Sequence, residues 1–80
     1  MHIEIITPDK KVFEGEVDSS TFPGAKGAFQ VLNNHAPLVS DLSQGKIKVS
    51  VSGQIQEFRI LGGVVEVLNN NISVLAEGIY

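Results

Sequence analysis

The chain has 80 residues, enough for one domain, and a domain of this size buries only about 60% of the surface of its unfolded chain. Its net charge is −3, and its lysines are scattered rather than gathered into a basic stripe. Because aromatic residues are also few, nucleic-acid binding is excluded as a main function. The absence of cysteine excludes disulfides and thiolate zinc sites.

Apolar residues occur in runs of four or five at most, far shorter than a membrane span. The first residues, Met1-His2-Ile3-Glu4, include neither a basic region nor the apolar core of a signal peptide. We therefore expect a cytoplasm-like compartment, with no direct insertion into a membrane. Any membrane association would go through a partner.

The first part of the chain alternates polar and apolar residues with a period of two. Ile3 and Ile5 alternate with polar neighbours, and Phe13, Gly15 and Val17 do the same over residues 12–18. This pattern predicts short β-strands with one wet face. Turn signals separate the strands, at residues 7–9 and again at residues 23–27.

The turn signal Gly24-Ala25-Lys26-Gly27 superficially resembles a phosphate-binding loop. The spacing of its glycines is too short, Gly27 stands where a Ser or Thr would hold magnesium, and no helix follows. We interpret it as a surface turn. Beyond it, residues 27–38 consist of two apolar pieces around a polar Asn33-Asn34-His35 tip, which predicts a shaped binding loop.

The second half continues in the same manner. Residues 36–43 are ambiguous, but Pro37 and the short length favour a strand, and residues 46–52 alternate without a fault. Ser52-Gly53 predicts a two-residue hairpin turn, and residues 69–71 can form another. The apolar series shifts phase between Ile55 and Phe58, which suggests a β-bulge. Residues 61–64 indicate a tight bend at the paired glycines.

The count is eight to ten short strands and no helix, and such a chain must stack its sheets to bury one face of each strand. We therefore predict an all-β fold, a flattened β-sandwich that forms a single domain over residues 1–80. Apolar residues occupy both faces at two places, residues 38–39 and residues 64–68. Since a thin sandwich buries one face of each strand, some of these side chains should form a surface patch for a partner.

Candidates for chemistry are few. His35 lies near Ser40 and Asp41 in sequence, but members of a triad meet in space, so we interpret it as a loop or interface histidine. His2 and Glu4 share a strand face and could offer two metal ligands, which is too few for a site.

The carboxylates Glu14, Glu16 and Asp18 alternate along one strand. Paired carboxylates can serve acid–base chemistry, but an acidic, solvated strand edge is the commoner structure.

Five motifs, in order, resemble the epsilon subunits of F-type ATP synthases (delta in mitochondria). The segment Asn34-His35-Ala36-Pro37-Leu38 resembles the Gly-His-Ala-Pro-Leu of that family. The other four are the opening strands at residues 5–17, the Pro-Gly turn at residues 23–27, the Gly-Gly strand at residues 61–67 and the closing strand at residues 72–76. Together they cover nearly the whole chain.

The resemblance implies a β-sandwich at the foot of the central stalk of a proton- or sodium-translocating ATP synthase. It implies a non-catalytic subunit without cofactors or metals, which couples rotation of the membrane ring to the gamma subunit. Its partners would be gamma and the polar loops of the ring. Its location would be the cytoplasmic face of the bacterial inner membrane, as a peripheral part of the complex.

Carried over residue by residue, the resemblance implies two sets of contacts. The ring-facing segment is Ala28, Phe29, Gln30, Val31, Leu32, Asn33, Asn34 and His35, and the gamma-facing residues are His35, Leu38, Val39 and Ser40. Many members of the family have Glu at the position of Ala28, so a salt bridge to a basic ring loop is not expected there.

Typical members continue into a C-terminal helical hairpin, which this chain does not contain. We expect a naturally short form, and we expect that the chain cannot inhibit hydrolysis by means of a hairpin. One alternative stays open from another class, a free-standing β-sandwich that binds a peptide or a carbohydrate. A small hydrolase built on His35 is a weaker one.

Overall fold

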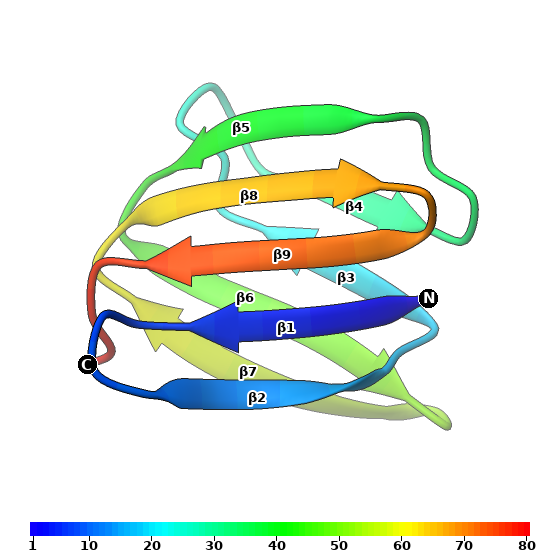
Figure 1. The fold of residues 1–80 in the computed structure, drawn as a ribbon, viewed down its shortest axis with the longest axis horizontal. Coiled ribbons are helices and arrows are strands. Elements are labelled where there is room, and N and C mark those ends of the chain that lie inside the picture. The colour runs from blue at the N-terminus through cyan, green and yellow to red at the C-terminus, as the bar shows by residue number, and fades with distance from the viewer.

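The computed structural model describes residues 1–80 as nine strands in two stacked sheets, without a helix (Figure 1). The five-stranded sheet has the order β2 (Lys11–Glu16), β1 (His2–Ile6), β9 (Asn71–Ala76), β8 (Gly63–Leu68) and β5 (Leu38–Leu42). The four-stranded sheet has the order β4 (Phe29–Leu32), β3 (Ser19–Phe22), β6 (Gly45–Val51) and β7 (Gln54–Ile60). The predicted all-β sandwich of eight to ten strands is confirmed.

The pairing within the sheets is antiparallel with one exception, the parallel pair of β1 and β9. No helix of the length and apolarity needed to cross a bilayer is present. Figure 1 shows the sandwich viewed along its shortest axis, and its extents are 26 × 24 × 19 Å.

The core lies between the two sheets and follows directly from the period of two. Fifteen apolar residues are buried in it, among them Ile3 and Ile5 of β1, Ile47 of β6 and the largest, Phe22 of β3. Each strand contributes alternate residues, so the intervening side chains are left on the two outer faces. Those outer faces are where partners can bind.

The sandwich has open sides where the edge strands of the two sheets face each other. On one side, Phe13 of β2 packs against Phe58 of β7 with ring centroids 5.2 Å apart. Inside the four-stranded sheet, Phe22 stacks obliquely on Phe29 at 5.5 Å. Such aromatic pairs contribute about 0.5–1.5 kcal/mol beyond their burial, and they close a small core that the strands alone would leave accessible.

The predicted hairpin turns are confirmed by their backbone angles. Ser52 and Gly53 have φ of 51° and 81°, and Asn69 and Asn70 have φ of 51° and 63°. Two consecutive residues with positive φ make the turn whose twist matches the strands on either side. The bend at the paired glycines is also confirmed, since Gly63 has φ of 154° and a Cβ added there would lie 2.2 Å from the carbonyl oxygen of Leu75.

The bulge predicted between Ile55 and Phe58 is wrong. β6 and β7 pair without interruption from Gly45–Ile60 to Val51–Gln54. Ile55 is 60% exposed and lies on the outer face, whereas Phe58 lies on the inner face, so the two belong to opposite faces of one regular strand. The register shift of the structure is elsewhere, between Ile5 and Ile6 where β1 pairs with β2.

The segment at residues 27–38 also differs from its prediction as one loop. Phe29 and Val31 point into the core from β4, and Val31 is fully buried. In an extended chain, side chains two residues apart point to the same face, which agrees with a strand at residues 29–32. The loop is therefore confined to residues 33–37. The ambiguous residues 36–43 become β5, as favoured from the sequence.

Candidate protein-binding surfaces

The outer face of the five-stranded sheet carries a row of apolar side chains. The register of the strands places Ile6 of β1 beside Leu75 of β9, and Leu75 beside Val64 of β8. Leu75 is 53% exposed and Val64 is 40% exposed. This row lines a shallow depression of about 350 Å³. Of the apolar residues predicted to contribute to a surface patch, Val64 lies in this row, whereas Val65 and Val67 are buried.

Val39 lies on the same outer face, on edge strand β5, but outside this row and outside the depression, because the partner of Val64 in β5 is Asp41. It is 69% exposed, the most exposed of the large apolar residues, and it pairs with Glu66 in the neighbouring strand. We define the apolar patch as Ile6, Leu75, Val64 and Val39. Glu4 and Glu66 line the same depression, and Asp41 pairs with Val64, so carboxylates border the patch.

The four residues predicted to face gamma do not share one surface. Val39 lies on the outer face, but Leu38 and Ser40 alternate with it and are partly buried. Ser40 lines a second groove, of about 310 Å³, between β5 and the β3–β4 turn that contains Lys26. His35 lies before the strand, in the β4–β5 loop.

The eight residues predicted to face the ring are divided even more sharply. Phe29 and Val31 belong to the core, while Gln30 and Leu32 are exposed, as expected for alternate residues of β4. Ala28 and Asn33 lie at opposite ends of β4, and Figure 1 shows the β3–β4 turn and the β4–β5 loop at opposite ends of the molecule. The predicted ring-facing residues therefore do not form one continuous surface.

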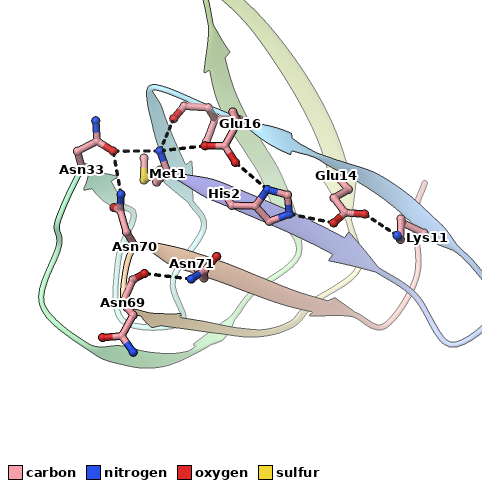
Figure 2. Close-up of polar contacts among 10 residues, drawn as sticks. Met1, His2, Lys11, Glu14, Glu16, Asn33, Asn69, Asn70 and Asn71 are labelled. Atoms are coloured by element: carbon pink, nitrogen blue, oxygen red, sulfur yellow. Dashed lines mark hydrogen bonds and ion pairs between the residues drawn. The ribbon is translucent and has the colours of Figure 1, made fainter.

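The β4–β5 loop is held by hydrogen bonds from distant parts of the chain (Figure 2). The Met1 amino group donates to Asn33 Oδ1 over 3.0 Å and to the Val17 carbonyl over 3.2 Å. The Asn34 backbone N–H donates to Asn70 Oδ1 over 2.8 Å, and Asn70 Nδ2 donates to Asn33 Oδ1 over 3.4 Å. These contacts could not be predicted from the sequence, because the partners are 16 to 37 residues apart.

A polar network covers the other margin of the five-stranded sheet. His2 lies between two carboxylates, with Nδ1 2.8 Å from Glu16 and Nε2 2.9 Å from Glu14, and Lys11 contacts Glu14 at 2.5 Å (Figure 2). The hydrogen bonds to Glu16 and Glu14 raise the pKa of His2 above its ordinary value. Lys11 and His2 hold the pKa of Glu14 below its ordinary value.

These contacts decide between the interpretations of the acidic strand. Glu14 and Glu16 lie on edge strand β2 with exposed side chains, which agrees with a solvated acidic edge. Asp18 lies beyond the strand and accepts a hydrogen bond from the Ser52 amide at 3.0 Å, so it supports the β6–β7 turn. No group of three or more potential metal ligands is assembled in the structure.

His35 is not assembled with a nucleophile. Its Nδ1 lies 2.7 Å from the carbonyl of Ala36, while Ser40 Oγ donates to the carbonyl of Asp41. No hydrogen bond joins His35 to Ser40 or Asp41. The geometry thus defines a β-sandwich with an exposed apolar patch and a polar loop end, the arrangement of a protein-binding module.

Comparison with known proteins agrees with a protein-binding module and identifies its family. The family model described as the β-sandwich domain of the ATP synthase delta/epsilon chain matches residues 1–80. The chain therefore belongs to this family, as the ordered motifs predicted.

Two bacterial relatives are named ATP synthase epsilon chain. The protein of Chlorobaculum tepidum is 43% identical over 76 residues, which cover 94% of this chain and 86% of the relative. The protein of Leptospira borgpetersenii is 36% identical over 77 residues, which cover 96% of this chain. The match spans only 61% of the length of the Leptospira relative.

The fold also recurs in a solved structure. A chain in the central stalk and c-ring of the Tetrahymena thermophila mitochondrial ATP synthase matches with a TM-score of 0.82. The similarity covers 99% of this chain and 64% of that one, at 20% identity. At this identity the comparison shows a shared fold.

Proposed function

We propose that this chain is a non-catalytic subunit of the central stalk of an F-type ATP synthase. In that role it transmits rotation between the membrane ring and the gamma subunit, as a peripheral component on the cytoplasmic side. Family membership and the names of its relatives support the proposal. The structural observation that carries it is the apolar patch, in which Val39, Leu75 and Val64 are 69%, 53% and 40% exposed.

The apolar patch is the contact that we assign to gamma. Val39 lies at its exposed end, and it is also among the residues that the family resemblance implies for gamma. Burial of apolar side chains supplies the affinity, and the bordering Glu66 and Asp41 favour a partner surface with lysine or arginine around an apolar centre.

We assign the ring contact to the end of β4 that lies opposite the loop with His35. A subunit that passes torque between two partners binds each through its own surface. The structure separates Ala28 from His35 by the length of a strand, while the β3–β4 turn and Val39 adjoin across the second groove. We therefore assign the β3–β4 turn with Ala28 to the ring, and the loop with His35 to the gamma side. Phe29 and Val31 support the turn from the core rather than contact a partner.

The decisive experiment measures binding to purified gamma by calorimetry, with two matched substitutions. Val39→Asp places a charge in the apolar patch, while Ile55→Asp places one on the outer face of the other sheet, at a residue that is 60% exposed. Burying an unpaired charge in an apolar contact costs more than about 1 kcal/mol, so Val39→Asp should weaken binding at least fivefold. Equal affinities of the two variants would refute the assignment of this face.

A further inference from the structure

The base of the β3–β4 turn is held to the end of β5 by backbone hydrogen bonds. The Ala25 N–H donates to the Asp41 carbonyl at 2.9 Å. The Ser43 N–H donates to the Pro23 carbonyl at 2.8 Å, and an isolated antiparallel bridge lies between the two bonds. Figure 1 shows the turn beside the C-terminal end of β5. We define residues 23–25 as the strap, which joins the two sheets because β3 and β4 belong to one and β5 to the other.

Two glycines leave only enough room for the strap. A Cβ added at Gly24 would lie 2.5 Å from the carbonyl oxygen of Gly27 and 2.9 Å from the ring of Phe29. A Cβ added at Gly45, the first residue of β6, would lie 2.8 Å from Cβ of Pro23. Neither Gly24 nor Gly45 has a positive φ, so close packing rather than backbone conformation excludes a side chain at both positions.

We infer that the strap makes the β3–β4 turn and β5 one rigid unit, and that Gly45 is the residue that positions the strap. Surface turns are ordinarily more mobile than the strands that they connect. Here the strap is bonded to Asp41, which lies in the same strand as Val39 and on the same face. Lys26 of the turn and Val39 also line one groove of about 310 Å³, so the turn and the strand adjoin beyond the strap as well.

The rigid unit connects the two surfaces that the proposed function assigns to different partners. Ala28 of the turn is assigned to the ring, and Val39 of β5 is assigned to gamma. Because backbone hydrogen bonds tolerate only small changes in length and angle, a force on the turn is passed to β5 instead of being absorbed by a change in the shape of the turn. This transmission of force rests on the proposed function, whereas the rigidity of the strap does not.

Two single substitutions and one double variant test the role of Gly45. Gly45→Ala places a methyl group against Pro23 and should displace the strap. Gly15→Ala is the matched control, because Gly15 also lies in a strand without a positive φ, and a Cβ there makes an ordinary contact of 3.6 Å with the ring of Phe13. Pro23→Gly removes the atom that the new methyl group meets, so Gly45→Ala should have a smaller effect when it is added to Pro23→Gly.

The first measurement is amide hydrogen exchange at Ala25 and Ser43, the two donors of the strap, in the isolated chain. The loss of one net hydrogen bond corresponds to an acceleration of about two- to tenfold, expected for Gly45→Ala and absent for Gly15→Ala. Leu61 donates its N–H to the carbonyl of Gly78 at 3.0 Å, beside the other isolated bridge. Exchange at Leu61 reports a general loosening of the sandwich and should not change.

The second measurement uses the assembled ATP synthase in sealed vesicles and compares the number of ions pumped with the ATP hydrolysed. A displaced strap lets the turn yield under torque, so Gly45→Ala should lower this ratio. Gly15→Ala should keep the ratio of the wild type. A role of Gly45 in stability alone would not separate the two variants after their assembly into the complex.

The outcomes distinguish the strap from the function on which its use depends. Unchanged exchange at Ala25 and Ser43 in Gly45→Ala would overturn the strap, whatever the partners are. Equal acceleration at Leu61 that persists in full when Gly45→Ala is added to Pro23→Gly would show a general loss of stability and overturn the positioning role.

Faster exchange at the strap with an unchanged pumping ratio would overturn the transmission of force, and the proposed function would stand if Val39→Asp weakens binding to gamma. Failure of the wild-type chain to bind folded gamma would refute the proposed function. The exchange measurement on the isolated chain would still decide whether Gly45 positions the strap.

Discussion

Gly63 is the position at which a single added methyl group should damage this fold most. It begins β8, next to β9, and a Cβ there would lie 2.2 Å from the carbonyl oxygen of Leu75 and 3.0 Å from Cα of Ala76. Both contacts are with backbone, so no side chain can move aside. The φ of 154° adds strain for any residue with a side chain.

The cost of Gly63→Ala can be worked from these two effects. Backbone strain of this kind costs about 1–3 kcal/mol, and forcing an extra methyl group into a packed region costs about 1–3 kcal/mol more. A sum of about 4 kcal/mol compares with a total stability of about 4–12 kcal/mol for a domain of 80 residues. The consequence extends to function, because β8 and β9 carry Val64 and Leu75 of the apolar patch.

Gly27→Ala is the matched control for this prediction. Gly27 has φ of 128°, also unfavourable for alanine, but a Cβ there meets nothing within 4 Å. Gly27→Ala should therefore lower the free energy of unfolding only by the cost of backbone strain, about 1–3 kcal/mol. Urea unfolding followed by circular dichroism measures both, and at about 1 kcal/mol per molar urea the two midpoints should differ by about 2 M. Similar midpoints would show that the sheet adjusts and that the steric argument is wrong.

Three further predictions concern the core and the polar network. Phe22→Ala should lower the free energy of unfolding by about 3–5 kcal/mol, since Phe22 is fully buried and stacks on Phe29, and an effect below about 1 kcal/mol in urea unfolding would contradict this packing. Ser20→Ala should be neutral or stabilising by up to about 1 kcal/mol in the same assay, because the buried Ser20 Oγ has no hydrogen-bond partner, and a clear loss would reveal a partner that the structure does not contain. The folded pKa of His2 is raised by Glu16 and Glu14, so the stabilisation from charged His2 should be complete below about pH 6.5 and be lost as the pH rises through the folded pKa. An NMR titration of the His2 imidazole checks this, and Glu16→Gln should lower its pKa, whereas an unchanged pKa would refute the contact.

The sequence by itself determined the fold class of this protein. The period of two requires strands, and the positions of Ser52-Gly53 and the paired glycines require the turns and the bend that the structure contains. These are local properties, because one or two residues decide whether the backbone can adopt a positive φ. The ordered motifs also predicted the family, which the comparisons confirmed.

The sequence pattern failed where the two faces of a strand had to be told apart. The shift between Ile55 and Phe58 suggested a bulge, yet the strand is regular and Ile55 is simply an apolar residue on an outer face. Likewise, residues 28–35 seemed to be one loop until Val31 was found in the core. The sequence pattern is the same for an apolar side chain in the core and for one that meets a partner on an outer face. Only the packing of the second sheet shows which face of a strand is buried.

The tertiary structure alone decided which residues share a surface. Val39, Val64, Leu75 and Ile6 come from four strands, and only the sheet order brings them onto one outer face. Asn70 reaches Asn34 across 36 residues of sequence for the same reason. Turns and strands follow from the conformational limits of each residue, but a binding surface depends on how distant strands pair, and that is set by the burial of the whole core at once.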